Sequence, residues 1–421
     1  MQDVRVIGQC RSCGNKRLVP ILSLGTMYVS NFVDAPGEKL VKAPLDLVLC
    51  NGKNSCSLLQ LRHTVALGLM YRNYWYKSGM NKTMVDALAD IANKAEQLVE
   101  LEEEEVVLDI GCNDGTLLRS YGKKGIKLAG FEPAVNLLPY AEKGTTKIIN
   151  DFFSSKEFKR HFRNQKAKIV TSIAMFYDLD EPNKFVADIV ECLDGAGVWV
   201  IQMSYLPSML EQNAFDNICS EHLEYYSLAS LERLLERHGL EVFDVELNDV
   251  NGGSFRAYVK HASSNAVKPF DGAGNRVKGL RESEKRLGLQ EKKTYQRFAG
   301  RVNKIKKSVV DFIRKETLKG KKVYVYGAST KGNTLLQYFG LDYRLIKAAA
   351  ERNPGKWGKK TVGTMIPIIS EEQARAEKPD YFLVLPWHFL EEFREREKAF
   401  FQSGGKFIVP LPEFRVTGFG E

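Results

Sequence analysis

Short apolar runs alternate with amphipathic stretches through the middle of the chain, which is the pattern of a parallel α/β sheet. The expected strands are 106–109, 127–131, 168–172 and 198–203. A helix is predicted over 228–238, because Leu231, Leu234 and Leu235 share one face and Gly239 stops it. Two strands at 241–246 and 254–259 are expected to close this sheet as an antiparallel pair.

The same alternation returns towards the C-terminus, after a long charged stretch. Residues 276–319 are predicted to form a helical connector, followed by strands at 322–326, 347–350 and 381–385 and a helix at 334–339. The sequence therefore predicts an α/β protein of three parts: a small domain at 1–75, a Rossmann-like domain at 76–262, and the connector with a second Rossmann-like domain at 263–421.

Composition narrows the class of protein. The 421 residues are 44% hydrophobic, as in globular proteins, and 61 basic less 52 acidic side chains give a net charge of +9. Much of the basic excess lies in 276–322, which is interpreted as a solvated helix with no nucleic-acid partner. No apolar run has membrane-spanning length and no leader precedes the first domain, so a cytoplasmic protein without a membrane partner is expected.

A glycine loop follows the first strand of the middle domain, and residues 116–121 are expected to begin a helix behind it. Residues 106–115 read Val-Val-Leu-Asp-Ile-Gly-Cys-Asn-Asp-Gly, and Gly111 and Gly115 let the backbone turn sharply beside a ligand. Glu132 ends the next strand, where an acidic side chain can accept hydrogen bonds from ribose hydroxyl groups. A nucleoside-cofactor site is predicted, although an ordinary strand-to-helix turn would also produce this loop.

The loop also indicates which cofactor binds. Asn113 stands where a dinucleotide loop has its middle glycine, and Asp114 would repel a diphosphate. A cationic ligand without phosphates fits better, and the pattern resembles class I methyltransferases that use S-adenosylmethionine (SAM). The predicted cofactor residues are Asp109, Gly111, Asn113, Asp114, Gly115 and Glu132.

Four of the seven cysteines fall within the first sixty residues. Cys10 and Cys13 form a Cys-x-x-Cys-Gly turn typical of zinc sites, and Cys50 and Cys56 supply a second pair at an unusually wide spacing. Four thiolates leave no open coordination position, so a structural Zn²⁺ ion is predicted. The alternative is a set of unrelated buried thiols.

Polar and aromatic side chains are dense at the strand ends above the glycine loop, in 172–180, 202–207 and 216–227. Glu221 and His222 are the candidate acid–base pair, because the ordinary pKa of histidine lies close to neutral pH. The alternative is that His222 only packs against the helix that begins near Leu228.

The C-terminal domain carries a second loop of this kind. Gly327, Ser329 and Lys331 follow a strand and precede a helix, so that backbone amides and side chains can receive a diphosphate or a ribose. Glu351 ends the next strand in the ribose-binding position, while Trp387 and His388 end a later strand and can contact a base or sugar. Tight packing around a short loop is the alternative.

These motifs together resemble the SAM-dependent sugar C-methyltransferases, which methylate a ring carbon of nucleotide-linked 4-keto deoxyhexoses. The resemblance covers nearly the whole chain and rests on motifs in the family's order: Cys10-x-x-Cys13-Gly, the loop at 109–115, Glu221-His-Leu-Glu-Tyr-Tyr-Ser227, Asn251-Gly-Gly-Ser-Phe-Arg256, Tyr326-Gly-Ala-Ser-Thr-Lys-Gly-Asn333, Glu351-Arg-Asn-Pro354 and Leu385-Pro-Trp-His388.

The resemblance implies an N-terminal zinc-binding domain, a central SAM domain and a C-terminal Rossmann-like domain that holds the nucleotide sugar. It implies His222 as the base that removes the proton α to the ketone, with Glu221 beside it. Family members often have His-Glu-His here, and Ser220 replaces the first histidine. The substrate-binding residues expected are Tyr74, Tyr76, Tyr225, Ser254, Gly327, Ser329, Lys331, Asn333, Glu351, Trp387 and His388.

The predicted function is therefore C-methylation of a nucleotide-linked keto sugar by a monomer or weak homo-oligomer. Two alternatives remain open: methylation of oxygen or nitrogen on another metabolite, and a non-catalytic protein that binds sugar nucleotides.

Overall fold

A seven-stranded sheet forms the centre of the molecule, in a computed structural model that describes residues 4–29, 31–34, 40–66, 68–72, 74–418 and 420. Its strands are β7 (Val106–Ile110), β8 (Lys127–Phe131), β9 (Lys147–Ile149), β10 (Ala167–Ile173), β11 (Leu193–Ser204), β13 (Leu240–Asn248) and β14 (Ser254–His261). In chain order they lie 3-2-1-4-5-7-6, and only β14 runs antiparallel to its neighbours. The strand order reverses between β7 and β10, and ligands bind at such a switch point.

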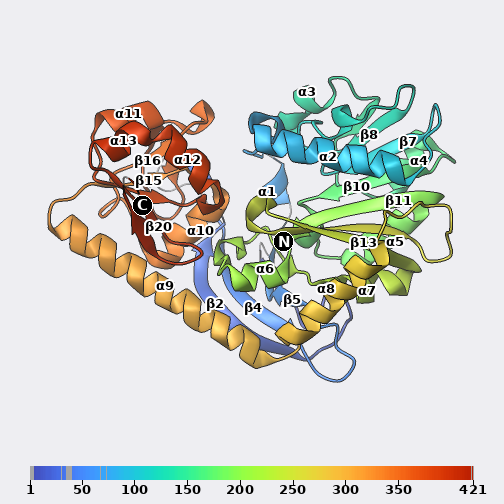
Figure 1. The fold of residues 1–421 in the computed structure, drawn as a ribbon, viewed down its shortest axis with the longest axis horizontal. Coiled ribbons are helices and arrows are strands. Elements are labelled where there is room, and N and C mark those ends of the chain that lie inside the picture. The colour runs from blue at the N-terminus through green and yellow to red at the C-terminus, as the bar shows by residue number, and fades with distance from the viewer. Residues whose placement is uncertain are drawn as a thin grey trace.

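Helices cover both faces of this sheet (Figure 1). They are α2 (Lys82–Leu98), α3 (Leu138–Ala141), α4 (Ser155–Phe162), α5 (Pro182–Cys192) and α7 (Leu228–Leu235), while α6 (Leu206–Glu211) packs in the core shared with the N- and C-terminal parts. The α7 helix begins where expected because the side chains of Ser227 and Ser230 form a capping box. A 3-10 turn, Glu236–His238, extends it to Gly239, which adopts the left-handed conformation.

One predicted helix after the glycine loop is nearly absent. The sequence favoured a helix from Thr116 to Tyr121, but the structure has only a 3-10 turn at Leu118–Ser120. Leu117 and Leu118 are buried, and the Arg119 side chain donates to backbone carbonyl groups of Asp114, Tyr140 and Lys143. Packing and these hydrogen bonds therefore stabilise the segment without a regular helix.

The C-terminal part builds a second, six-stranded sheet. Its strands are β15 (Val323–Tyr326), β16 (Ala349–Glu351), β18 (Ile368–Ser370), β19 (Tyr381–Val384), β20 (Lys406–Val409) and β21 (Arg415–Thr417). In chain order they lie 3-2-1-4-5-6, the Rossmann order, with an antiparallel last strand. Its helices are α10 (Thr330–Phe339), α11 (Glu371–Ala376), α12 (Leu390–Arg396) and α13 (Lys398–Gln402).

The predicted single connector helix is two helices, α8 (Ala273–Leu287) and α9 (Lys292–Leu318). They separate at Gly288, whose left-handed conformation (φ 66°) ends α8. The interpretation of this stretch as a solvated helix is also wrong. One face of α9 is buried, through Tyr295, Phe298, Val302, Ile305, Val309 and Ile313, as the helix runs beneath the N-terminal sheet to the C-terminal lobe (Figure 1).

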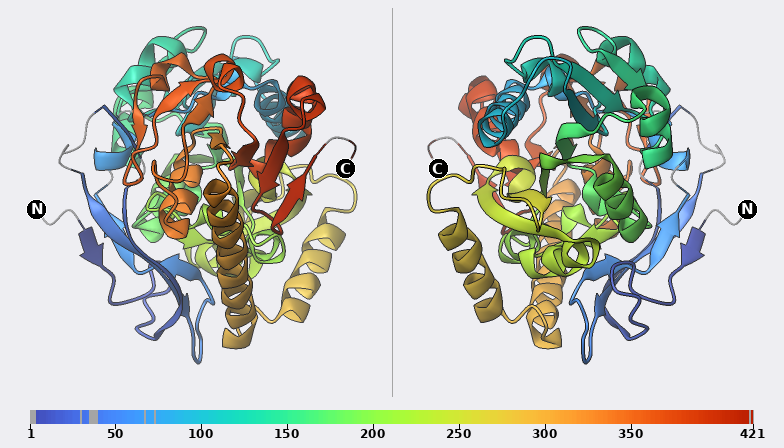
Figure 2. Two further views of the ribbon diagram at one scale, coloured as in Figure 1. Left: turned by 90° about the vertical axis from the view of Figure 1, so that its left-hand side faces the viewer. Right: turned by 90° about the vertical axis from the view of Figure 1, so that its right-hand side faces the viewer.

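The N-terminal part contributes a four-stranded sheet, which lies at the junction of the two lobes (Figure 1) and along one side of the molecule in the side views (Figure 2). It contains β2 (Leu18–Tyr28), β4 (Lys42–Cys50), β5 (Leu59–Leu61) and β12 (Glu224–Tyr225), and β12 comes from the middle of the chain. Smaller pairs join β1 (Val4–Val6) to β6 (His63–Val65) and β3 (Phe32–Val33) to β17 (Lys360–Thr361) of the C-terminal part. The short helix α1 (Gly68–Tyr71) leads into the central part.

The structure thus has the predicted α/β class, with two Rossmann-like sheets and a cysteine-containing N-terminal sheet. The boundaries after residues 75 and 262 stay predictions. Within the described part of the chain, no helix combines the length and apolar character needed to cross a membrane.

Candidate active site and zinc centre

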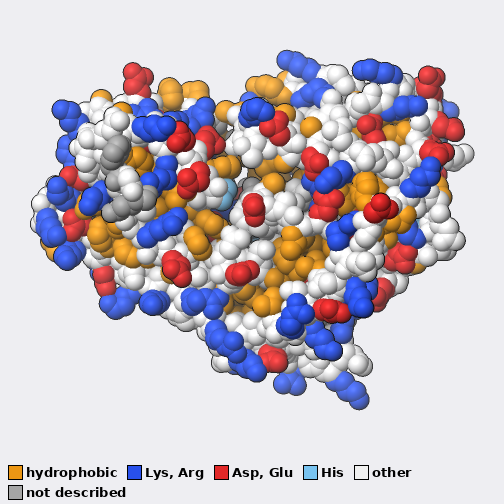
Figure 3. All heavy atoms as spheres, viewed as in Figure 1, with side chains coloured by type: hydrophobic (Ala, Val, Ile, Leu, Met, Phe, Trp, Pro, Cys, Tyr) orange, Lys and Arg blue, Asp and Glu red, His pale blue; other side chains and the backbone are white. Residues whose placement is uncertain are grey.

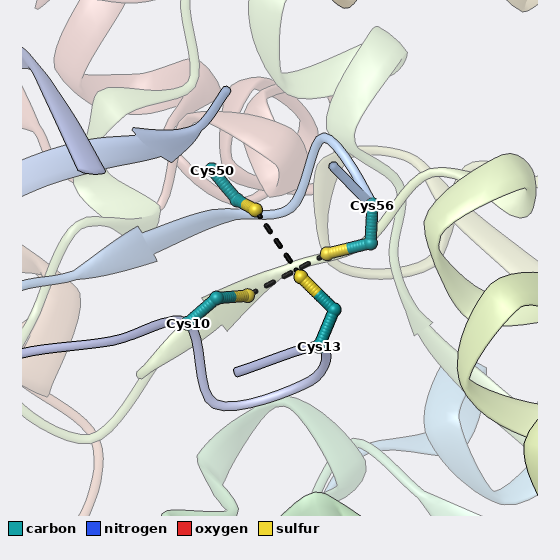
Figure 4. Close-up of side chains that lie close together, drawn as sticks. All are labelled: Cys10, Cys13, Cys50 and Cys56. Atoms are coloured by element: carbon teal, nitrogen blue, oxygen red, sulfur yellow. Dashed lines mark hydrogen bonds between the residues drawn. The ribbon is translucent and has the colours of Figure 1, made fainter. Parts of the chain in front are cut away.

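The four N-terminal cysteines converge at one point (Figure 4). The Cys10 and Cys56 sulfur atoms lie 3.5 Å apart, and those of Cys13 and Cys50 lie 3.4 Å apart. All four sulfur atoms lie within 4.8 Å of one another. A tetrahedral Zn²⁺ ion with Zn–S bonds of about 2.3 Å needs sulfur atoms about 3.8 Å apart, so the cluster fits this ion.

Side chains around the cluster fit a thiolate site as well. The Gln60 amide donates to Cys10 Sγ at 3.1 Å, and the Asn15 amide donates to Cys50 Sγ at 3.6 Å. Hydrogen bonds of this kind stabilise the negative charge of metal-bound sulfur. The wide spacing of Cys50 and Cys56 is accommodated by a turn at Gly52, which has a φ of 114°.

The predicted cofactor loop lies at the carboxyl end of β7. Gly111 adopts a φ of 73°, and a side chain there would approach Met175 to 3.3 Å. The two Glu132 oxygen atoms accept hydrogen bonds from the backbone N–H groups of Asn113 and Ala134, both at 2.8 Å. Each carboxylate oxygen can accept a second bond, so Glu132 retains the capacity to bind hydroxyl groups of a ribose.

Two predicted cofactor residues face away from the cavity. Asp114 accepts hydrogen bonds from the backbone of Gly79 at 2.8 Å and from the Thr116 hydroxyl at 2.6 Å. Gly115 packs closely against the backbone of Ala141. These residues shape the loop and attach it to the segment before α2.

Asp109 lies beneath this loop and is buried. Thr171 donates to its carboxyl group at 2.6 Å. Burial raises the pKa of Asp109 to about 7, and the Thr171 hydrogen bond opposes that shift. Burial also raises the pKa of Glu132 to about 7, so both carboxyl groups in the floor of the site are about half ionised near neutral pH.

The candidate acid–base pair lies in the segment between α6 and α7. His222 Nδ1 lies 2.8 Å from the backbone carbonyl of Asn217. Since a carbonyl oxygen only accepts, Nδ1 carries the proton and Nε2 has a free lone pair. The ring of Tyr177 packs 4.4 Å from the imidazole and fixes its plane.

Burial shifts the two members of the pair in opposite directions. It lowers the pKa of His222 to about 3, aided by the nearby Lys331 charge, so the imidazole is neutral. It raises the pKa of Glu221 to about 7, and Lys331 opposes that shift. A Glu221 oxygen and a His222 nitrogen lie within 4.8 Å of each other, so the protonation state of each group affects the pKa of the other.

The C-terminal loop repeats the geometry of the cofactor loop. Gly327 has a φ of 85°, and Glu351 accepts hydrogen bonds from the backbone of Ala328 at 3.0 Å and of Asn353 at 2.9 Å. Lys331 Nζ reaches across to the Asn217 side-chain oxygen at 2.6 Å. The second loop is thereby joined to the residue whose backbone orients His222.

One cavity of about 930 Å³ connects both loops with the acid–base pair, and the molecular surface is hollowed between the two lobes (Figure 3). The predicted residues that line it are Asp109, Gly111, Asn113, Glu132, Glu221, His222, Tyr74, Tyr76, Ser254, Gly327, Ser329, Lys331, Glu351 and His388.

Three predicted substrate residues lie behind the cavity wall. Tyr225 is buried and donates to the backbone carbonyl of His222 at 3.1 Å. The Asn333 amide donates to the Asn31 carbonyl at 2.9 Å, and the Trp387 indole donates to Asp216 at 3.1 Å. The Asn333 and Trp387 hydrogen bonds join the C-terminal part to the N-terminal and central parts, whereas the Tyr225 bond stays within the catalytic segment.

Other residues that the sequence did not predict also line the cavity. They include the buried hydroxyl groups of Tyr71 and Tyr177, the carboxyl group of Asp178, and the cationic side chains Arg352, Lys356 and Arg396. Asp178 lies in the polar segment 172–180, so density of polar residues was the only signal. Arg352 belongs to the motif at 351–354 and Lys356 follows it closely, whereas Arg396 ends α12, and nothing in the sequence places it beside the other two.

Comparison with known proteins finds matches along most of the chain. Family models match as a zinc binding domain over residues 10–71, a methyltransferase domain over 76–245 and a C-methyltransferase C-terminal domain over 249–412. The C-methyltransferase NovU of Streptomyces niveus is 32% identical over 424 residues, covering 99% of this chain and 98% of NovU.

Solved structures resemble part of the chain only. A complex of the Haloferax volcanii Trm112 activator with a methyltransferase is 18% identical, covering 44% of this chain and 94% of that chain, with a TM-score of 0.36. The plantazolicin methyltransferase BamL, solved with S-adenosylhomocysteine (SAH), is 13% identical, covering 43% and 87%, with a TM-score of 0.35. TM-scores this low support no conclusion about this chain from either structure.

The fold and site define a SAM-dependent methyltransferase with a zinc-binding domain. The chain belongs to the C-methyltransferase family. The predicted fold class, enzyme class, SAM and Zn²⁺ are thereby confirmed.

Proposed function

We propose that this enzyme transfers the methyl group of SAM to a ring carbon next to the ketone of a nucleotide-linked sugar. The single observation that supports this most is the shared cavity. It joins the Gly111 loop, the Glu221–His222 pair and the Gly327 loop, so two ligands can meet beside one base.

In this proposal the glycine loop of β7 holds SAM. Glu132 binds the ribose hydroxyl groups, and Asp109 and Gly111 line the loop that approaches the rest of the ligand. SAM, when bound, supplies a methyl group on a positively charged sulfur, which a carbon nucleophile can attack.

The Gly327 loop holds the nucleotide diphosphate of the substrate. Its backbone amides, Ser329 and Lys331 begin α10, and the N-terminus of a helix favours phosphate. Glu351 takes the ribose position, as Glu132 does on the other sheet. The keto sugar then extends towards His222, with Tyr74 and Tyr76 beside it.

His222 is the base. Its Nε2 lone pair takes the proton from the carbon next to the ketone, and the electron pair moves onto the ketone oxygen as an enolate. Above pH 7 the Glu221 carboxylate is available to stabilise the imidazolium that forms. The enolate carbon then attacks the methyl group, the sulfur–methyl bond breaks, and the ketone forms again.

Hydrogen exchange tests the proposal directly. The probe is thymidine-diphosphate-4-keto-6-deoxyglucose in deuterated water with SAH in place of SAM. We expect the wild-type enzyme to exchange the α hydrogen, and His222→Ala to lose about 100-fold or more of that exchange while it still binds SAH.

Methyl transfer without any exchange would contradict C-methylation and favour an O- or N-methyltransferase. Binding of the probe with neither exchange nor transfer would favour a non-catalytic protein. Loss of SAH binding in His222→Ala would contradict its role as a base. A location in the cytoplasm, the absence of a nucleic-acid partner, and a monomeric or weakly oligomeric state stay predictions of the sequence.

A further inference from the structure

The carboxyl group of Asp178 lies in the wall of the cavity and has no part in the proton transfer and methyl transfer proposed for this enzyme. Asp178 ends a 3-10 turn, Phe176–Asp178, at the carboxyl end of β10. The neighbouring Tyr177 carbonyl accepts a hydrogen bond from the Leu223 backbone at 2.9 Å. The turn is thus fixed against the residue that follows His222.

The Asp178 carboxyl group has fewer partners than an ordinary buried carboxylate, with the Tyr71 hydroxyl as a hydrogen-bond donor beside it. Its Oδ1 atom is shielded from water and has no hydrogen-bond partner among the described residues. Nor does any described cation form an ion pair with it, whereas Asp180, two residues on, pairs with Arg11 at 3.2 Å and accepts from Thr64 at 2.9 Å. A buried polar atom without a partner is costly, and the Asp178 side chain also lines the cavity, where its carboxyl group can meet a polar group of the bound substrate.

The protonation state defines what that partner is. Burial and the nearby carboxyl groups of Glu221 and Glu224 raise the pKa of Asp178 well above its usual value, while Tyr71 and Lys331 oppose the shift. The raised pKa favours the protonated form of Asp178, and a protonated carboxyl group donates a hydrogen bond. Its ligand partner is then an oxygen acceptor.

We propose that Asp178 donates a hydrogen bond to the ketone oxygen of the substrate and to the enolate oxygen that develops from it. The inference rests on the proposed function, because only a carbon acid passes through an enolate. Asp178 keeps its proton throughout: His222 takes the carbon proton, negative charge appears on the ketone oxygen, and the hydrogen bond strengthens as it does.

The two carboxyl groups of the site then have different tasks. Glu221, with a pKa of about 7, exchanges protons beside His222. Asp178 remains a hydrogen-bond donor. Environments that separate the pKa values of neighbouring carboxyl groups are how one site provides an acid and a base at the same pH.

The test compares Asp178→Asn, whose amide still donates, with Asp178→Leu, which cannot donate. Exchange of the α hydrogen of the same probe is measured in deuterated water with SAH, together with kcat, KM and SAH affinity. We expect Asp178→Leu to lose about 100-fold in exchange and in kcat with KM and SAH affinity unchanged, and Asp178→Asn to lose less than about tenfold. Glu181→Gln, an exposed carboxylate on the same rim, is the control and should match the wild type.

The infrared carbonyl stretch of the bound probe provides a second measurement that does not need the leucine variant to fold. A donor on the ketone oxygen weakens the C=O bond, so the stretch in Asp178→Asn should lie at higher frequency than in the wild type. Equal exchange in the leucine variant and the wild type, or an unchanged stretch in Asp178→Asn, would refute the role of Asp178 but not the proposed function. Absence of exchange in the wild type would instead refute the proposed function.

Discussion

Two adjacent side chains, Glu221 and His222, provide a proton acceptor because burial acts on them in opposite directions. The imidazole is kept neutral, and the carboxyl group is half ionised near neutral pH. A backbone carbonyl selects which imidazole nitrogen is free. Neither residue alone would act as a base of suitable strength in so buried a place.

The pH dependence of kcat follows from these shifts. The raised pKa of Glu221 means that its carboxylate forms only as the pH rises through about 7. We therefore expect kcat to increase with pH around 7, which gives the kcat–pH profile an acid limb. Glu221→Gln should lose this acid limb along with most of the rate. His222 titrates near pH 3 and contributes nothing to this limb. A limb that persists unchanged in Glu221→Gln would exclude this assignment.

At the scale of elements, the zinc-binding sheet supports the catalytic segment. Strand β12 follows His222 directly and pairs with β5, through Glu224 with Gln60 and Tyr225 with Leu59. Leu61 also donates to the Leu223 carbonyl at 2.8 Å. Cys50 ends β4, which pairs with β5, and Cys56 lies in the loop that leads into β5, so zinc bound there supports the strand against which the His222 segment is placed.

Loss of zinc should therefore affect turnover more than SAM binding. We expect Cys13→Ser to lose zinc, measured by metal analysis, and about tenfold or more of kcat, because support outside an active site typically contributes that much. SAH affinity by calorimetry should change little, since the Gly111 loop belongs to the other sheet. Cys192→Ser, which removes a buried thiol outside the four-cysteine cluster, is the matched control. An unchanged kcat in zinc-free Cys13→Ser would disprove the coupling.

Apolar periodicity predicted the strands well, because β7, β8, β10 and β11 are buried and their pattern reflects that burial. It failed where tertiary contacts decide the backbone. The helix expected after the glycine loop is a 3-10 turn, and the single connector is broken at Gly288. A glycine within a charged stretch does not by itself reveal that the chain turns there.

At the scale of the whole molecule, two Rossmann-like sheets present equivalent loops to one cavity. Glu132 and Glu351 each accept a backbone hydrogen bond from the glycine loop of the preceding strand. Lys331 crosses from one sheet to the catalytic segment of the other. Occupation of the C-terminal loop by an anion and the charge state of the base are thereby linked.

Lys331→Met tests this link. Lys331 lowers the pKa of Glu221, so its removal should raise that pKa and move the acid limb of kcat to higher pH. Lys356→Met is the control, because Lys356 binds the Ala328 carbonyl and Glu351 and has no part in the Glu221 shift. In Lys356→Met the rise of kcat with pH should have the same midpoint as in the wild type, even if KM changes. Equal midpoints in Lys331→Met and the wild type would count against the link.

The sequence predicted most of the cavity because its residues end strands, and strand ends of one sheet share an edge. It also assigned Tyr225, Asn333 and Trp387 to substrate binding, and the structure places them behind the wall. Motif membership cannot distinguish a side chain that faces the ligand from one that packs beneath it. The sequence did not predict Asp178 for a related reason. That its Oδ1 atom has no hydrogen-bond partner among the described residues is visible only in three dimensions.

The central claim is that a carbon atom, activated between the two sheets, receives the methyl group. The most direct measurement uses SAM labelled with ¹³C in its methyl group and a keto-sugar nucleotide labelled with ¹³C in the ring. Nuclear magnetic resonance of the product should show a one-bond carbon–carbon coupling between the methyl group and the ring carbon beside the ketone. A labelled methyl group without that coupling, attached through oxygen or nitrogen, would contradict the account.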